Sequence, residues 1–385
     1  MKVCFICPEY PEGPHGGIGT LVQIISRKLV KLGNEVRVIG IYPKSYPAPD
    51  FEEDFGVKVW RLRLRKGRLG WIIPYILQYK MIKKWAKTGD IEIVEAPDSR
   101  GWYAFWPKLP VPLLLRANGS NIYFSNILKT RISIITFFLE RKSYSRADAI
   151  IAASNYTAEV LKKFINSNKK IEIIYNGINL PELKEGLVRN SNRILFTATL
   201  NRKKGILEFV EAIKILFNKQ LEFDVDIYGK DTRDNEFGSV KSYIFKNIPS
   251  ELKKKISVRD HISRQELAKV YQTGSVAVFP SFAEAFAMAP LEAMACGCPV
   301  INTKLGSGSE FIENGINGIL VDPTQPKEIA DAIEKILKND EFAKIIGKKG
   351  KEQVENFFSN DTMVSKTLKC YSQIINNFKF NKNGR

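Results

Sequence analysis

Two glutamates eight residues apart, Glu284 and Glu292, lie in the segment with the clearest chemical pattern of the chain. A strand-like run ends at Pro280, a loop carries Glu284, and a helix is expected to begin near Ala287 and to stop at Gly297. The first N–H groups of such a helix have no intrahelical partner and can hold a diphosphate. Glu292 can then accept hydrogen bonds from two ribose hydroxyls, and Glu284 can contact a sugar. Glutamates at this spacing are usually surface charges, but the flanking apolar, Gly and Pro residues favour a binding site here.

A glycine-rich loop, residues 8–20, precedes the first predicted helix. The backbone at Gly16 and Gly17 can approach an anion closely, and the helix N-terminus adds positive potential. The third glycine of a dinucleotide fingerprint is missing, and no Gly-Lys-Ser/Thr of a P-loop follows, so a plain turn is the alternative. The two histidines, His15 and His261, lie on loops predicted to face a ligand, although lone histidines are more often structural.

The sequence has few side chains that could ligate a metal ion. The Cys4-x-x-Cys7 pair lies within an apolar run that reads as a buried strand, and no second such pair exists. The five cysteines are therefore expected to be reduced packing residues. The only Asp-x-Asp, Asp224-Val225-Asp226, lies inside a predicted strand rather than on a strand-end loop. We expect no metal site and no cofactor.

The formal net charge is +18, and residues 1–190 carry 30 Lys and Arg against 17 Asp and Glu. This half of the chain is the one expected to face an anionic partner. Nucleic acid is disfavoured because no recognisable nucleic-acid-binding motif is present. The apolar segment 71–77 follows the densest basic cluster, which suits contact with an anionic membrane, or else a solvated strand end and an ordinary amphipathic helix. That cluster contains Arg61, Arg63, Arg65, Lys66 and Arg68.

The chain lacks any run of about 18 uncharged apolar residues, so we expect no spanning helix. Its start runs straight into Pro8 and Glu9, which is too short for a signal-peptide core. These observations predict a cytoplasmic protein with peripheral contact at the inner face of the plasma membrane.

Strand-like and helix-like segments alternate almost throughout, which implies βαβ units and parallel sheets. A polar stretch at 179–192 interrupts the series and predicts a linker between two domains. We place the N-terminal domain at 1–184 and the C-terminal domain at 185–360. Helices dominate the end of the chain, with a last helix expected at 361–378 and a disordered tail from 381. Because ligands bind beyond the carboxyl ends of parallel strands, the loops after the strands should carry the chemistry.

These motifs resemble the retaining glycosyltransferases of family 4, which have the GT-B fold: two Rossmann-like domains facing each other across a cleft. The resemblance covers nearly the whole chain, and the final helix of such proteins usually returns to the N-terminal domain. It rests first on Glu284-x7-Glu292 and the following Ala-Met-Ala-Cys-Gly-Cys-Pro-Val. The other matching segments are Gly16-Gly17, Glu95-Ala96-Pro97-Asp98, Glu140 with 146–154, 176–179, 203–205, 228–231, 306–310 and 314–323.

The resemblance also implies a role for each matching residue. Lys204 matches the family's diphosphate-binding lysine, and Arg202 is the expected substitute for an arginine whose position Thr199 occupies. Fixed cations there would stabilise the charge that develops on the leaving phosphate. Together with Glu284, these two residues form the predicted catalytic set. The remaining roles are phosphate binding for Gly16, Gly17, Ala287 and Met288, ribose or base binding for Glu292, His261 and Ile262, and acceptor or donor-sugar contact for His15, Glu95, Arg116 and Asn118.

Three positions depart from the family pattern. Asn118 stands where a histidine is common, and an asparagine can hydrogen-bond a sugar but cannot exchange a proton near neutral pH. Thr199 replaces the arginine, and Ala287 replaces a frequent glycine beside the phosphates.

The predicted reaction moves a sugar from a nucleoside-diphosphate sugar to an acceptor hydroxyl with retention. We expect a glycan or lipid-linked acceptor, in the biosynthesis of cell-surface polysaccharide or glycolipid. The alternative, which Asn118 keeps open, is a catalytically inactive sugar- or nucleotide-binding protein of the same fold.

Overall fold

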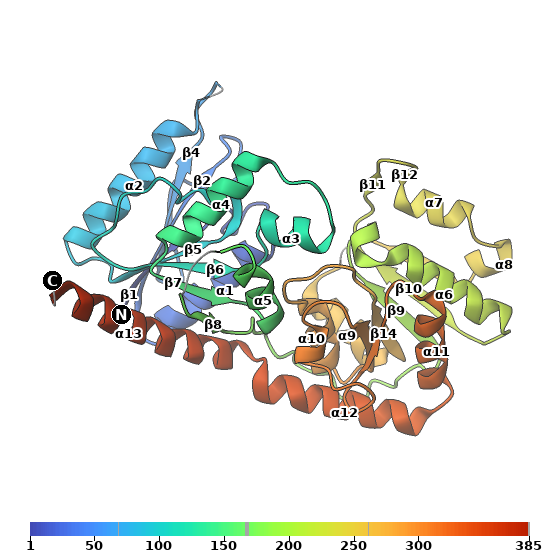
Figure 1. Cartoon of the computed structure of the whole chain (residues 1–385). Helices are drawn as coiled ribbons and strands as arrows, with labels where there is room; N and C mark the ends of the chain where they lie inside the picture. Colours follow the sequence, from blue (N-terminus) through green and yellow to red (C-terminus); the bar gives the residue numbers. More distant parts are fainter. Residues whose placement is uncertain (68, 166–168, 261, 384–385) are drawn as a thin grey trace. The chain divides into compact units, whose positions relative to one another are not determined.

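The computed structural model describes residues 1–67, 69–165, 169–260 and 262–383. It divides into two compact units, residues 1–176 with 360–385 and residues 177–359, and each is built around a parallel sheet (Figure 1). The change from the first unit to the second thus falls just before the polar stretch 179–192.

The sheet of the first unit has the strand order β3-β4-β2-β1-β5-β6-β7-β8, and every pair is parallel except β3 with β4. The strand β3 was not expected because its sequence, Phe-Glu-Glu-Asp, is mostly acidic and has no apolar alternation. The strands are β1 (Lys2–Ile6), β2 (Glu35–Tyr42), β3 (Phe51–Asp54), β4 (Val57–Arg63), β5 (Ile93–Pro97), β6 (Leu113–Ala117), β7 (Ala149–Ala152) and β8 (Ile171–Ile173).

Helices cover both faces of this sheet, as the alternation of buried side chains in β1 requires. Val3 and Phe5 pack in one apolar cluster with α1 and α13, whereas Cys4 and Ile6 pack in another with α2, α4 and α5. The helices are α1 (Gly17–Lys31), α2 (Ile72–Lys87), α3 (Asn121–Ile127), α4 (Ile134–Arg146), α5 (Asn155–Lys162) and α13 (Asn360–Asn383), with a 3₁₀ turn η1 (Ser99–Gly101).

The last helix, α13, belongs to the first unit although it follows the second in sequence. It packs against α1 through buried side chains that include Val364 and Tyr371. The expectation of a disordered tail from residue 381 was wrong in part, because α13 continues to Asn383. No Gly or Pro, the two residues with the lowest helix propensity, occurs between residues 360 and 383. The first of them is Gly384.

The sheet of the second unit has the order β13-β10-β9-β14-β15-β16 and is parallel throughout. The chain passes from β9 outward in one direction to β13 and then resumes on the other side of β9 with β14. This reversal is a topological switch point, where open parallel sheets bind ligands. The strands are β9 (Arg193–Thr197), β10 (Asp224–Tyr228), β13 (Ile256–Arg259), β14 (Val276–Phe279), β15 (Val300–Thr303) and β16 (Ile319–Val321), with a small hairpin of β11 (Arg233–Asp234) and β12 (Gly238–Ser239).

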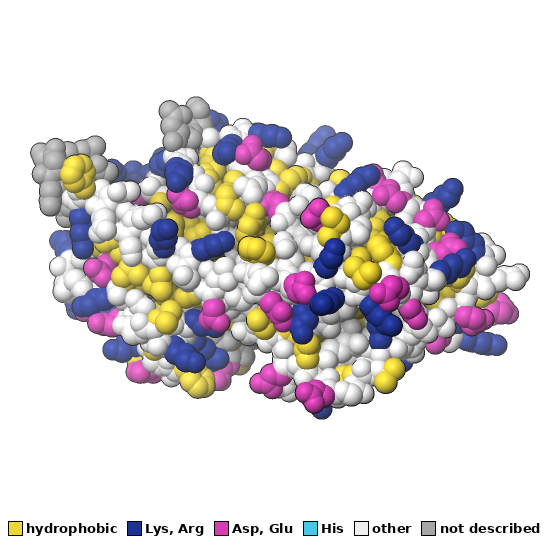
Figure 2. All heavy atoms as spheres, turned by 90° about the horizontal axis from the view of Figure 1, so that it is seen from below, with side chains coloured by type: hydrophobic (Ala, Val, Ile, Leu, Met, Phe, Trp, Pro, Cys, Tyr) yellow, Lys and Arg dark blue, Asp and Glu magenta, His cyan; other side chains and the backbone are white. Residues whose placement is uncertain are grey.

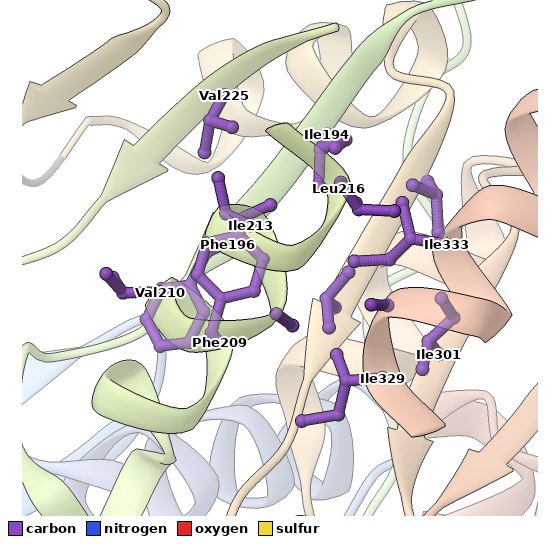
Figure 3. Packing of buried hydrophobic residues seen from close by; sticks show 14 of the residues in the cluster. Ile194, Phe196, Phe209, Val210, Ile213, Leu216, Val225, Ile301, Ile329 and Ile333 are labelled. Atoms are coloured by element: carbon purple, nitrogen blue, oxygen red, sulfur yellow. The ribbon is translucent and has the colours of Figure 1, made fainter. Parts of the chain in front are cut away.

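A dense apolar core holds one face of this sheet against α6 and α11 (Figure 3). The rings of Phe196 on β9 and Phe209 on α6 lie 5.1 Å apart, and Ile333 of α11 is fully buried in the same cluster. Each such side chain contributes roughly 1.5–3 kcal/mol of transfer free energy. The helices are α6 (Ile206–Asn218), α7 (Val240–Lys246), α8 (Ser250–Lys253), α9 (Arg264–Thr273), α10 (Met288–Ala295), α11 (Pro326–Leu337) and α12 (Asp340–Phe357), with 3₁₀ turns η2 (Arg202–Lys204) and η3 (Gly308–Glu310).

Candidate functional site

Two loops meet at the switch point of the second unit, one after β9 and one after β14. The backbone N–H of Phe282 donates to the carbonyl of Lys203 at 2.8 Å, which joins the two loops directly. Gly205 has a φ of 70°, and a Cβ there would lie 2.0 Å from the carbonyl oxygen of Pro280. Glycine is therefore required both for the left-handed backbone and for the close approach of the loops.

This junction brings Lys204 and Glu284 together. The Lys204 Nζ donates to Glu284 Oε1 in a part-buried ion pair. The backbone N–H of Lys204 donates to the side chain of Asn201 at 3.0 Å, which fixes the turn that carries the lysine. The sequence predicted that both residues address the donor, and the structure places them in contact with each other.

Arg202 lies on the same 3₁₀ turn, but its side chain turns toward the β11–β12 hairpin. Its Nε donates to Asp234 at 2.7 Å, and its Nη2 donates to Glu236. The guanidinium also lies 5.0 Å from the ring centroid of Phe237. Arg202 is thus two residues from Lys204 along the chain, while its charge is balanced by two carboxylates at the hairpin.

The N-terminus of α10 follows the Glu284 loop. Ala287 is the N-cap residue, and no side chain caps the helix there. Because Pro290 has no N–H, the first-turn donors of the helix are those of Met288 and Ala289. Ala287 has a φ of −82°, which any L-residue adopts, so alanine replaces the family's frequent glycine without backbone strain.

Glu292 lies one turn further along α10 and lines a cavity of about 680 Å³. Burial raises the pKa of the Glu292 carboxyl, and the nearby charge of Arg264 on α9 opposes this shift. Tyr271, also on α9, lines the cavity and bonds through its hydroxyl to Thr197 Oγ1 at the end of β9. Tyr271 and Arg264 were missed from the sequence because they belong to no recognised motif.

The predicted base-binding pair cannot be placed fully. His261 lies outside the described residues, and Ile262 is half-buried on the loop between β13 and α9.

In the first unit, the glycine-rich loop leads into α1 as expected, with Gly16 as the N-cap. The carboxylate of Glu9 accepts a hydrogen bond from the Gly19 N–H at 3.0 Å and so lies at the helix N-terminus itself. A Cβ on Gly17 would meet no atom within 4 Å, whereas one on Gly19 would lie 1.9 Å from the Glu9 carbonyl oxygen. His15 is exposed on this loop, with its Nδ1 2.8 Å from the carbonyl oxygen of Gly13.

Glu95 and Arg116, two of the predicted sugar-contacting residues, are buried in the first unit. They form a buried bidentate ion pair, with Arg116 Nε 2.7 Å from Glu95 Oε1 and Nη2 3.0 Å from Oε2. Tyr371 donates its hydroxyl to the same carboxylate, and Thr367 lies within 3.4 Å of the guanidinium; both residues are on α13. The two charges lie under α13, which covers this face of the sheet, and their hydrogen bonds hold the helix there.

Asn118 lies in a network of buried polar groups at the ends of β5 and β6. Its Oδ1 accepts from Asn176 Nδ2 at 3.2 Å, and its N–H donates to Asp98 at 3.4 Å. Burial raises the pKa of Asp98 to about 7 and the nearby Glu140 adds to the shift, whereas the hydrogen bond from Tyr144 opposes it. Asp98 was not among the predicted site residues, although the sequence placed it in a segment that matches the family.

Two arginines of the basic cluster at the end of β4 are already paired within the protein, so they are less available to an anionic partner than the sequence suggested. Arg61 is buried, pairs with Glu52 and donates to the carbonyl oxygens of Pro49 and Pro11. Arg63 is committed to Asp50 and to backbone carbonyls. Arg65 and Lys66 are exposed.

The five cysteines are buried thiols, and burial raises the pKa of Cys4 and of Cys7 to about 12. Within the described ranges, no group of three or more His, Cys, Asp or Glu side chains is arranged to hold a metal ion. In those same ranges, none of the helices has both the length and the apolarity needed to traverse a bilayer. On the face of the molecule in Figure 2, Lys and Arg side chains are scattered among Asp and Glu rather than gathered in one patch.

The two units have the sheet topology of the GT-B class of glycosyltransferases. The second unit has a lysine–glutamate pair at its switch point, followed by the N-terminus of α10 and the half-buried Glu292. Residues 15–182 match the sequence model of Glycosyltransferase Family 4, and residues 182–353 match that of Glycosyl transferases group 1. An uncharacterized glycosyltransferase of Methanocaldococcus jannaschii is 31% identical over 97% of this chain and 99% of its own length. The chain therefore belongs to the glycosyltransferases with the GT-B fold.

Solved structures agree with this fold. Sucrose-phosphate synthase from Thermosynechococcus elongatus superposes with a TM-score of 0.75 at 18% identity, covering 97% of this chain and 99% of its own. HepE from Anabaena, in complex with UDP, also gives a TM-score of 0.75 at 16% identity, covering 97% and 100%.

Proposed function

We propose that this chain is a retaining, metal-independent glycosyltransferase that moves a sugar from a nucleoside-diphosphate sugar to an acceptor hydroxyl. The observation that carries the proposal is the Lys204–Glu284 pair, which the joined loops hold next to the N-terminus of α10. A cation, the first-turn amides of a helix and a carboxylate are the groups that a sugar diphosphate requires.

The donor is proposed to bind along α10. Its diphosphate lies at the N–H groups of Met288 and Ala289 and is balanced by the Lys204 ammonium. Its ribose hydroxyls donate to Glu292 in the cavity of about 680 Å³, which has room for a nucleoside. Glu284 contacts the hydroxyls of the donor sugar. HepE is described with UDP and with UDP-glucose, which makes a UDP sugar the first donor to test.

In the proposed step, the bond between the anomeric carbon and the β-phosphate oxygen breaks as the acceptor oxygen bonds to the same face of that carbon. The departing phosphate oxygen takes the acceptor's proton, so no carboxylate forms a covalent intermediate. Lys204 and the α10 amides stabilise the charge that grows on the leaving diphosphate. These groups supply the positive charge that a metal ion would otherwise provide.

The acceptor is proposed to be a glycan or a lipid-linked sugar bound by the first unit, in cell-surface polysaccharide or glycolipid biosynthesis. The side-chain amide of Asn118 and the exposed His15 are the candidates to contact it. The hydrogen bond from Asn176 to the Asn118 side chain supports this assignment because it orients the amide, while Asp98 accepts from the Asn118 backbone N–H.

A donor screen tests the proposal. The protein is incubated with UDP-, GDP- and ADP-sugars and an acceptor mixture in EDTA, and released nucleoside diphosphate and glycosylated product are measured by mass spectrometry. We expect release with one nucleotide class, and a product whose anomeric coupling in NMR matches that of the donor. An inverted product contradicts retention. Tight nucleotide binding without any transfer supports the inactive binding protein instead.

A further inference from the structure

The surface of α3 and α4 combines exposed apolar side chains with cations. Ile134 and Ile135 at the start of α4 are 86% and 71% exposed, and Phe138, one turn on, is also exposed. Leu128 at the end of α3 and Phe105 on the loop between η1 and β6 add two further exposed side chains. Isolated apolar residues on a surface need no explanation, but a contiguous group marks an interaction site.

The apolar and basic side chains share one face of α4. Positions i, i+4 and i+7 lie on the same side of a helix, so Arg141 stands beyond Ile134 and Phe138. Lys142 stands beyond Ile135 in the same way. Its ammonium lies 4.6 Å from the ring of Phe105 and 5.6 Å from that of Phe138, which places these groups side by side.

Negative charge is absent from the exposed part of this surface within residues 121–147, all of which the structure describes. The only acid of the segment is Glu140, which is fully buried. Its carboxylate accepts hydrogen bonds from the backbone N–H groups of Arg100, Asn121 and Ile122. Four exposed or half-exposed cations of the segment therefore have no acid beside them within residues 121–147: Lys129, Arg131, Arg141 and Lys142. Arg146, by contrast, donates to the carbonyl oxygen of Trp106 and interacts with Asp148.

We propose that this face, formed by Phe105, Leu128, Ile134, Ile135 and Phe138 with the cations around them, docks on an anionic lipid surface. The apolar side chains enter the boundary between headgroups and acyl chains, and the cations pair with lipid phosphates. Charge complementarity favours an anionic lipid surface over the other partners. A second copy of the chain would bring like charges together, and an uncharged glycan would leave the charge of these cations without counter-charge. The proposal does not depend on the proposed reaction.

Vesicle co-sedimentation of the full chain tests the proposal. We expect binding to mixed phosphatidylglycerol–phosphatidylcholine vesicles, weak binding to pure phosphatidylcholine, and loss of binding at high salt. The double variant Ile134→Ser/Ile135→Ser and the double variant Arg131→Gln/Arg141→Gln should each lower the bound fraction at least about fivefold. Circular dichroism melts identical to wild type confirm that both variants fold.

A matched control changes the same kinds of side chain elsewhere. Ile345 on α12 is exposed beside exposed lysines, so Ile345→Ser/Lys344→Gln/Lys349→Gln should bind vesicles as wild type does. An equal loss in this control overturns the proposal, because net charge alone would then explain binding. Unchanged binding in both α4 variants also overturns it, as does a shift from dimer to monomer in light scattering of Ile134→Ser/Ile135→Ser, which would identify a second copy as the partner.

A variant on α2 tests whether the lipid contact lies there instead. Ile73 and Leu77 are exposed on α2, next to the basic end of β4. If Ile73→Ser/Leu77→Ser abolishes vesicle binding while the α4 variants retain it, the membrane contact lies at α2 and the α4 proposal fails.

Discussion

The ammonium of Lys204 donates to the carboxylate of Glu284 although 80 residues separate them in sequence. The contact exists because β9 and β14 are neighbours at the switch point and because Gly205 lets the loop after β9 approach Pro280. In the proposed reaction the lysine charge is thus held in place before the donor arrives, and little reorganisation is needed during the step.

Replacing Lys204 by Ala should lower kcat by about 10²–10³-fold, because a fixed cation that stabilises the leaving diphosphate is lost. Nucleotide affinity, measured by calorimetry, should change much less. Lys214→Ala on α6, which removes a half-exposed lysine paired with Glu211, is the control and should leave turnover unchanged. Equal turnover in the Lys204 variant removes this residue from the mechanism.

Arg202→Ala should have a smaller effect on turnover than Lys204→Ala. In the structure its charge is balanced by Asp234 and Glu236 at an exposed site, and exposed pairs of this kind contribute about 0–1 kcal/mol. Side-by-side steady-state kinetics of the two variants measure the difference. A larger loss in the arginine variant would mean that Arg202 leaves its carboxylate partners and carries the phosphate charge.

Glu292→Ala should weaken donor nucleotide binding by about 1–3 kcal/mol, through loss of hydrogen bonds to a charged acceptor. Burial raises the pKa of this carboxyl, so protonation begins at a higher pH than for an ordinary glutamate. Nucleotide affinity should therefore fall as the pH is lowered through that raised pKa, and titration calorimetry across pH measures the decline. The pH dependence should be absent in Glu292→Gln, and an identical decline in that variant assigns the titration to another group.

Asp98→Asn should change how the stability of the first unit depends on pH. The pKa of Asp98 is raised to about 7, so its neutral form favours the folded state and that contribution is lost as pH rises toward 7. Between pH 5 and 7 the stability of the variant relative to wild type should rise by about 1.4 kcal/mol per pH unit. Thermal melts of both proteins across this range measure the difference, and parallel profiles contradict it.

Arg116→Ala should destabilise the first unit by about 3–5 kcal/mol, because it leaves the Glu95 carboxylate buried without its ionic partner. The double variant Glu95→Met/Arg116→Met should cost less than Arg116→Ala, since no uncompensated buried charge remains. Urea denaturation measures both. Arg141→Ala, at an exposed arginine of the same unit, serves as the control with a change within about 0.5 kcal/mol.

The family resemblance and the alternation of strands and helices were enough to predict the fold class. The GT-B fold was confirmed by the superposition on sucrose-phosphate synthase. Strand β9 and helix α11 have local sequence signals, namely apolar periodicity and, for α11, Pro326 at its first position. The short acidic strand β3 has no such signal. Its extended conformation comes from its pairing with β4.

The sequence alone was enough to indicate which segments are candidates for the chemistry: the Glu284–Glu292 loop and helix, the turn with Lys204 and the glycine-rich loop. Only the tertiary structure decided what each charged side chain contacts. Arg116 pairs with a glutamate 21 residues away under a helix from the end of the chain, and Asp98 is buried to the point that its carboxyl titrates near neutral pH. The physical reason is that backbone propensity and apolar period act over a few residues, whereas ion pairs and desolvation depend on which distant strands and helices pack around a group.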